Sequence, residues 1–91
     1  MTRIAKRIRV TGRVQGVFYR AWTRSEARKL GVTGWVRNRS DGSVEAQVEG
    51  DEQAVAHLID LMREGPPGLA VDGLTCEETG DLGLNAFEIR N

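Results

Sequence analysis

The sequence predicts an α+β sandwich in which an antiparallel sheet carries two helices on one of its faces. Two observations lead to this fold class. Apolar residues recur at strand or helix spacing in the order strand, helix, strand, strand, helix, strand, with a short extra strand at the C-terminus. The strand patterns give the sheet one apolar face and one charged face, so both helices have to cover the same face.

Length and composition limit the class of protein. The chain has 91 residues, 40% of them hydrophobic and 29% charged, which is typical of a single globular domain, here residues 1–91. Its apolar runs are short and its basic N-terminus lacks the apolar stretch of a signal peptide, so we expect no membrane partner. The lone Cys76 cannot form an internal disulfide. This fits a reducing cytoplasm, and we expect a cytoplasmic monomer.

The first half of the chain is predicted to hold a strand, a helix and a second strand. Residues 4–14 alternate apolar residues with arginines, the pattern of a half-buried strand. Helical spacing follows, and Gly31 supplies the left-handed residue that commonly ends a helix. Residues 32–38 then form the second strand, with Asn38 on its apolar face.

A hairpin joins this strand to the next through a turn at Asp41 and Gly42. The third strand alternates valine and alanine with glutamate and glutamine. We expect the polar side chains to form a solvated face on which Arg37 and Arg39 oppose the glutamates across the strands.

The second helix is expected to begin at a cap residue, Asp51, and to end at Gly65, which two prolines follow. Residues 71–78 form a less cleanly patterned fourth strand, and Phe87 and Ile89 flank a glutamate in a short last strand. The resulting βαββαβ order with one added strand is the ferredoxin-like arrangement.

The formal net charge of zero conceals a division between the two halves of the chain. Residues 1–40 hold eleven Arg or Lys and one acid, whereas residues 41–91 hold two Arg and twelve acids. One interpretation is that two complementary halves fold against each other. The other is an anion-binding surface in the basic half.

The stretch VQGVFYR places Arg20 where a strand gives way to a helix. A cation is mildly unfavourable at a helix N-terminus, so this position needs an explanation. Gly16 allows a turn that points successive N–H groups into one concavity, and such a concavity binds a phosphate-sized anion. The guanidinium of Arg20 can then hold two phosphoryl oxygens. The alternative is an ordinary solvated arginine at the end of a loop.

Asn38 is the second candidate, because a polar amide stands in an otherwise apolar row of its strand. Burying such a group without a partner is costly. Asn38 either satisfies carbonyls of the following turn or reaches the mouth of the concavity beside Arg20.

Two stretches carry a family resemblance: VTGRVQGVFYR (10–20) and GWVRNRSDGSVEAQVEG (34–50) resemble the two signatures of the acylphosphatase family, and the closing FEIR also fits. Tyr19 departs from the pattern, which has phenylalanine there, so its hydroxyl needs water or a partner. The resemblance implies a ferredoxin-like fold and an acylphosphate phosphohydrolase that works without metal or cofactor. It also implies that Arg20 binds the phosphate and that Asn38 positions a water. The phosphate-binding backbone is implied to comprise Gln15, Gly16, Val17, Phe18, Tyr19 and Arg20.

The residue types agree with this chemistry. Cys76 is interpreted as a small core residue and His57 as an exposed helical residue, so no nucleophile and no metal-ligand spacing is found. Water must then attack. A carboxylate, whose conjugate acid has a pKa of about 4, leaves without a proton, so acyl phosphates suit the site better than phosphate esters. The phosphate dianion is a hypothetical proton acceptor.

Two other functions remain as alternatives. The first is a non-catalytic ferredoxin-like module that binds RNA or another polyanion. Two features count against it: only Trp35 is expected to project from the charged face as a stacking platform, and Glu45 and Glu49 would repel phosphate. The second is a relative of the acylphosphatase-like domains in larger carbamoyl-transfer proteins. Met1 and the compact ending favour a free-standing enzyme with a small acyl phosphate as its partner and no nucleic acid.

Overall fold

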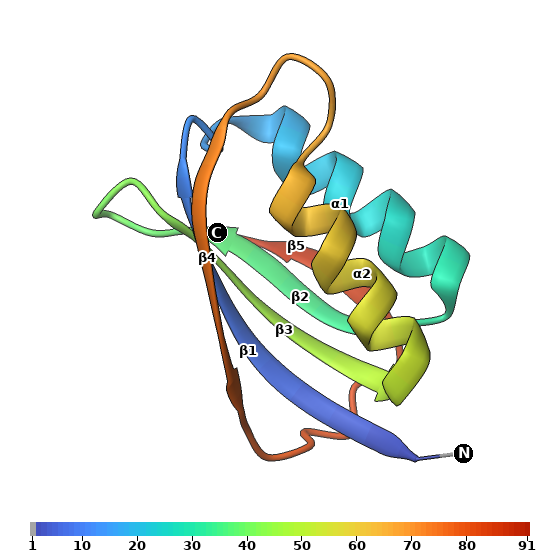
Figure 1. Cartoon of the computed structure of the whole chain (residues 1–91). Helices are drawn as coiled ribbons and strands as arrows, with labels where there is room; N and C mark the ends of the chain where they lie inside the picture. Colours follow the sequence, from blue (N-terminus) through green and yellow to red (C-terminus); the bar gives the residue numbers. More distant parts are fainter. Residues whose placement is uncertain (1) are drawn as a thin grey trace.

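The computed structural model describes residues 2–91, except the side chain of Val17, and Met1 lies outside the described residues. These residues form the strands and helices β1 Arg3–Gly12, α1 Val17–Leu30, β2 Thr33–Asn38, β3 Val44–Asp51, α2 Glu52–Glu64, β4 Val71–Glu78 and β5 Phe87–Arg90. The strands lie in the order β4-β1-β3-β2-β5, and both helices pack on the same face of the sheet (Figure 1). The predicted ferredoxin-like fold is confirmed. Neither described helix has the length and apolar character needed to cross a membrane.

The sheet is antiparallel, as predicted, except at one edge. β1 pairs antiparallel with β3 and β4, and β2 pairs antiparallel with β3. β5 instead pairs in parallel with β2, with Phe87 opposite Gly34. The parallel pairing arises because the chain leaves β4 at one edge and crosses to the other edge at the end where β2 begins.

The helix ends follow the signals in the sequence. Gly31 follows α1 in the left-handed conformation, with φ of 72°. The carboxylate of Asp51 caps α2 by accepting a hydrogen bond from the Gln53 amide at 3.2 Å. Gly65 then ends α2. Local chemistry therefore determines where both helices stop.

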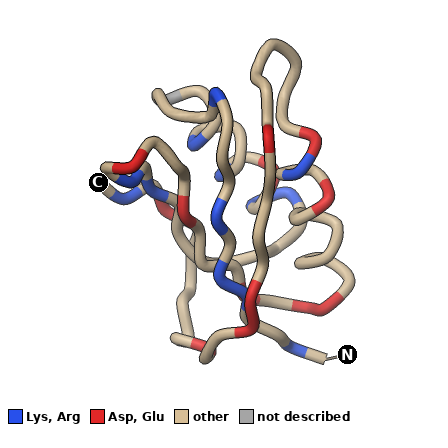
Figure 2. Tube along the Cα trace, turned by 60° about the vertical axis from the view of Figure 1, so that its left-hand side comes forward, with Lys and Arg blue, Asp and Glu red and all other residues tan. Residues whose placement is uncertain are grey.

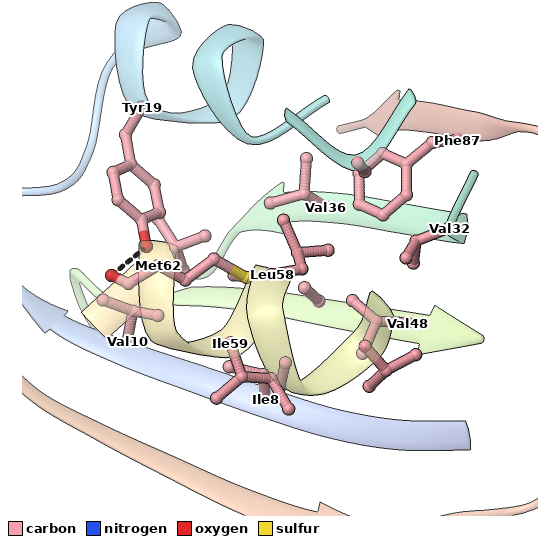
Figure 3. Close-up of a cluster of buried hydrophobic side chains, with 14 of the residues drawn as sticks. Ile8, Val10, Tyr19, Val32, Val36, Val48, Leu58, Ile59, Met62 and Phe87 are labelled. Carbon is pink, nitrogen blue, oxygen red and sulfur yellow. Dashed lines mark hydrogen bonds between the residues drawn. The ribbon is translucent and has the colours of Figure 1, made fainter. Parts of the chain in front are cut away.

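The hydrophobic core fills the space between the sheet and the helices (Figure 3), and its large members include Ile8, Val10, Val36, Val48, Leu58, Met62 and Phe87. Tyr19 also lies in this core and is fully buried. Its hydroxyl donates to the Met62 carbonyl at 2.9 Å. Residue 66 would be the helical partner of this carbonyl, but it is a proline and has no N–H. The tyrosine therefore has the partner that its hydroxyl was expected to need.

The second face of the sheet is not the solvated face that the sequence analysis expected. Glu45 is only 8% exposed, and Gln47 and Glu49 are fully buried. For Gln47 and Glu49 the reason is the connection between β4 and β5, which has to cross from one edge of the sheet to the other. Residues 79–86 pass over this face and cover the end of β3 (Figure 1).

Glu49 holds this connection on the sheet. Its carboxylate accepts hydrogen bonds from the amides of Leu82 at 2.8 Å and Leu84 at 3.1 Å. Gln47 Nε2 donates at 2.8 Å, and Arg3 adds an ion pair at 3.3 Å. A buried carboxylate is tolerated when donors surround it in this way.

Trp35 lies beneath three guanidinium groups on the same face. Arg7, Arg37 and Arg90 each lie 5.0 to 5.3 Å from the ring centroid, within the range of a cation–π interaction. Only 5% of Trp35 is exposed. Its ring is therefore not an open platform for base stacking, which the polyanion-binding alternative needed.

Ion pairs across this face join the basic and the acidic half of the chain. Glu45 contacts Arg37 at 2.7 Å, Arg39 at 3.2 Å and Arg7 at 3.6 Å. Burial alone would raise the pKa of Glu45, but the Arg37 hydrogen bond and the nearby arginine charges outweigh it and lower the pKa below its ordinary value. Figure 2 shows basic residues along β1 and acidic residues on the strand beside it. These contacts fit the interpretation in which the basic half and the acidic half of the chain fold against each other.

We predict that Glu49→Gln lowers the free energy of unfolding by about 2–4 kcal/mol, because an amide cannot accept from all the donors that surround the buried carboxylate. Urea denaturation measures the difference. The control is Glu77→Gln, since Glu77 is exposed on β4 and its replacement should change stability by less than about 0.5 kcal/mol. Equal effects of the two substitutions would show that Glu49 does not hold the β4–β5 connection.

Candidate active site

The connection from β1 to α1 leaves the helix N-terminus without a side-chain cap. Gly16 occupies the cap position with φ of 102° and ψ of 179°, and no acidic residue lies in the first turn. The first N–H groups of a helix have no partner within it. An uncapped N-terminus of this kind is suited to an anion.

Arg20 lies in the first turn of α1 and folds back toward the loop. Its Nε donates to the Gly16 carbonyl at 3.1 Å. This contact uses only one edge of the guanidinium, so both Nη groups keep N–H donors for a ligand. The odd placement of a cation at this N-terminus is understandable if an anion binds between it and the helix.

Asn38 is the last residue of β2 and continues the row of Val36, which is fully buried. Its Oδ1 is buried and has no hydrogen-bond partner within the described part of the chain. Leaving such an acceptor unpaired costs about 1–3 kcal/mol, so the atom is set up for a ligand or a water. Asn38 also lines a hollow of about 230 Å³ with Arg37, Arg39 and Ser40.

The Gln15 side chain brings the two candidates to the same end of the molecule. Its Nε2 donates to the carbonyl of Arg39 at 2.7 Å and to that of Ser43 at 3.0 Å. Both carbonyls belong to the turn that follows Asn38. The structure thus joins the 15–20 loop to the end of β2, although the described contacts include none directly between Arg20 and Asn38.

The turn after Asn38 is itself held by short-range bonds. Asp41 accepts hydrogen bonds from the amide and the hydroxyl of Ser43, at 2.9 and 2.6 Å. The Ser43 hydroxyl and then its amide lower the pKa of Asp41 below its ordinary value. The turn is therefore closed by hydrogen bonds among its own residues.

The other predicted loop residues differ in their surroundings. Phe18 is 59% exposed, whereas Tyr19 is fully buried. Burial raises the pKa of the Tyr19 phenol, so it remains a neutral hydrogen-bond donor. Val17 is the first residue of α1, and its side chain lies outside the described part of the structure. The Tyr19 side chain supports the loop from below, while a bound anion would meet the loop backbone.

Cys76 and His57 lie on other elements. The expectation that Cys76 belongs to the core is wrong: the residue is exposed on β4, which is an edge strand of the sheet. His57 is exposed on α2, as predicted. Within residues 2–91, no three His, Cys, Asp or Glu side chains gather closely enough to hold a metal ion.

The side chain of Gln15 is a feature that the sequence analysis missed, because it gave this residue only a backbone role. Its partners are carbonyls more than twenty residues away along the chain. No pattern within the VQGVFYR stretch indicates such partners.

The chain matches a known protein family over most of its length. The sequence pattern of acylphosphatases matches residues 6–89. The chain belongs to the acylphosphatase family. It is 53% identical to an acylphosphatase of Anaeromyxobacter dehalogenans over 97% of this chain and 96% of the relative.

Solved structures agree with this assignment. The acylphosphatase of Bacillus subtilis superposes with a TM-score of 0.92 at 37% identity, covering 97% of this chain and 99% of that one. Full-length HypF matches with a TM-score of 0.91 at 28% identity, covering 99% of this chain but only 12% of HypF. The chain is thus an acylphosphatase that hydrolyses acyl phosphates, and its fold also occurs within a larger protein.

We predict that Gly16→Ala weakens the binding of inorganic phosphate, measured by titration calorimetry. An added Cβ would meet nothing within 4 Å, so the change acts through the backbone, whose φ of 102° an alanine rarely adopts. Gly68→Ala is a matched control, with φ of 89° and equally open surroundings in the loop after α2. Both variants should lose about 1–3 kcal/mol of stability, but only Gly16→Ala should lose phosphate affinity. Unchanged affinity in Gly16→Ala would show that the loop backbone does not hold the phosphate.

Proposed function

We propose that this enzyme cleaves acyl phosphates by in-line attack of a water held by Asn38 on a phosphoryl group bound by Arg20 and the backbone of residues 15–20. The observation that supports this most is the buried Oδ1 of Asn38, which has no hydrogen-bond partner among the described residues. Asn38 ends a strand whose following turn is tied to the uncapped N-terminus of α1 through Gln15. Asn38 can thus hold the attacking water, while Arg20 and the loop backbone hold the phosphoryl group.

The phosphoryl group is the part of the substrate that the loop and Arg20 stabilise. In a loose transition state, negative charge is spread over the three equatorial oxygens. The N–H groups of the α1 N-terminus and the two Nη groups of Arg20 can donate to these oxygens. Donors that are already oriented toward developing charge are the largest single contribution in many enzymes.

Asn38 provides the nucleophile by orientation. Its Oδ1 accepts a hydrogen bond from the water, which directs an oxygen lone pair toward phosphorus. A new O–P bond forms as the bond from phosphorus to the acyl oxygen breaks, and the carboxylate leaves with that electron pair. The water proton passes to an oxygen of the phosphate dianion, so no protein base takes part.

The leaving group determines the substrate class. A carboxylate, with a conjugate acid of pKa about 4, needs no proton to leave at neutral pH, whereas an alkoxide does. The proposed site contains an arginine, an asparagine and backbone amides, none of which is a general acid at neutral pH. A mixed carboxylic–phosphoric anhydride is therefore the bond that this site can cleave, with neither a metal nor a cofactor.

We also propose that the enzyme acts as a cytoplasmic monomer on small acyl phosphates. The thiol of Cys76 is exposed, and a free thiol persists in a reducing compartment. Among the described side chains, the exposed large hydrophobic ones are Phe18 and Leu82, and isolated residues of this kind do not make an apolar interface.

We predict that excess EDTA leaves the rate of benzoyl phosphate hydrolysis unchanged and that phenyl phosphate is nearly inert. The first result follows from a site of arginine, amide and backbone groups, and the second from the missing general acid. Ultraviolet absorbance follows both substrates. Loss of activity on chelation, or comparable rates on the two substrates, contradicts the proposal.

We predict that Arg20→Lys lowers kcat by about a hundredfold to a thousandfold, the usual effect of losing one well-placed electrostatic group. Phosphate inhibition should also weaken, because lysine keeps the charge but cannot bind two oxygens while contacting the Gly16 carbonyl. The control is Arg24→Lys, one turn further along α1, which should behave like the parent protein. If Arg20→Lys keeps full phosphate affinity and turnover, another residue binds the phosphate.

We predict that Asn38→Ala lowers kcat by at least about a hundredfold while the inhibition constant of phosphate changes little, because a group that orients water acts on the transition state. Asn85→Ala, in the exposed β4–β5 connection, is the matched control and should leave both values unchanged. A thermal melt excludes unfolding. A loss of phosphate affinity in step with kcat would make Asn38 a phosphate ligand instead.

A further inference from the structure

The Gln15 side chain makes a contact that its place in the phosphate-binding backbone does not require. One nitrogen, Nε2, donates to two carbonyls, those of Arg39 and Ser43. The same two residues close the β2–β3 turn through a backbone bond from Arg39 N to Ser43 O at 2.8 Å. Gln15 therefore binds the turn at its base, where the Arg39–Ser43 backbone bond closes it directly after Asn38.

The remaining anchors on either side of the loop connect residues 13–20 to other parts of the molecule. The Arg13 amide donates to the Ala70 carbonyl at 2.8 Å, in the segment before β4. The Tyr19 hydroxyl donates to Met62 on α2. Among the hydrogen bonds described for residues 2–91, those of the Gln15 amide are the ones that join the loop to the segment after Asn38. Without them, the loop could shift relative to Asn38 and keep its other anchors.

We propose that Gln15 is a positioning residue: its side-chain amide sets the separation between the phosphate-binding loop and Asn38, and so places the attacking water in line with the bound phosphorus. This inference rests on the proposed roles of Arg20 and Asn38. Reacting atoms have to lie about 3–3.5 Å apart, and a displacement of about 1 Å can lower a rate about a hundredfold. A side chain that ties the two halves of such a site together affects the rate without touching the substrate.

The chemistry of the contact explains why glutamine suits this position. The contact needs two N–H donors on one nitrogen at the end of a side chain with two methylene groups. Asparagine is one methylene shorter, methionine has similar length but no donor, and an ionised glutamate has only acceptors to present to two carbonyl oxygens. Each substitution removes the tie in a distinct and testable way.

The first test is Gln15→Met, assayed with benzoyl phosphate and with inorganic phosphate as inhibitor. We expect kcat to fall by about tenfold to a hundredfold, while the inhibition constant of phosphate stays within about twofold, since the loop backbone and Arg20 are intact. Asp51→Ala, which removes the α2 cap far from the site, is the control for lost stability and should keep kcat. An unchanged kcat in Gln15→Met, or a parallel loss of phosphate affinity, overturns the proposal.

The second test uses Gln15→Glu and a pH profile. The ionised carboxylate cannot donate to the two carbonyls, but the protonated form has one O–H that can donate to one of them. We expect the deficit in kcat relative to the parent protein at the same pH to shrink as pH falls toward the carboxyl pKa, ordinarily about 4.3. The deficit of Gln15→Met should not change with pH. A pH-independent deficit in Gln15→Glu overturns the proposal.

The third test combines Gln15→Met with Asn38→Ala. If Gln15 acts by placing the loop relative to Asn38, its loss should lower kcat no further once Asn38 is gone, so the two effects should be strongly non-additive. Additive effects overturn the positioning role. This outcome is separable from failure of the proposed function, which would show as full turnover in the single variants Arg20→Lys and Asn38→Ala.

Discussion

Gly16 caps α1 without a side chain, and no side chain of the described residues caps the first N–H groups of this helix. Helix N-termini need acceptors, and most chains supply a serine, threonine or aspartate at this position. This chain does so for α2, where Asp51 accepts from the Gln53 amide. The two helices therefore differ: the chain caps the N-terminus of α2 with its own carboxylate, whereas we propose that the substrate phosphate serves as the acceptor at the N-terminus of α1.

The two ends of the sheet show the same contrast. At the end covered by the β4–β5 connection, the amides of Leu82 and Leu84 converge on the buried carboxylate of Glu49, so the protein supplies its own anion. At the opposite end, the amides of the β1–α1 loop and the side chain of Arg20 have no carboxylate described among them. At the first end a buried carboxylate of the protein accepts from the backbone amides, and at the second end we propose that the substrate phosphate takes this place.

Local chemistry made much of the fold predictable, whereas contacts between distant segments did not. The end of α1 at Gly31 and the position of Asn38 on the helix-covered face follow from conformational preference and strand alternation. The burial of Glu49 and the parallel pairing of β5 depend on how residues 79–86 cross the sheet, which no local pattern encodes. The Gln15 contact was unpredictable for the same reason: the sequence places its residue type in the site, and only the fold brings its partners to it.

In the proposed mechanism, the loop binds the phosphoryl group while Asn38 holds the incoming oxygen on the opposite side from the leaving group. A crystal structure of the enzyme with orthovanadate tests this most directly, because five-coordinate vanadate imitates phosphorus during in-line attack. The proposed mechanism predicts that the amides of the 15–20 loop and the Nη groups of Arg20 bind the equatorial oxygens. It also predicts one apical oxygen within about 3.2 Å of Asn38 Oδ1, the length of a hydrogen bond. Vanadate bound elsewhere, or in the loop with neither apical oxygen near Asn38, would contradict the account.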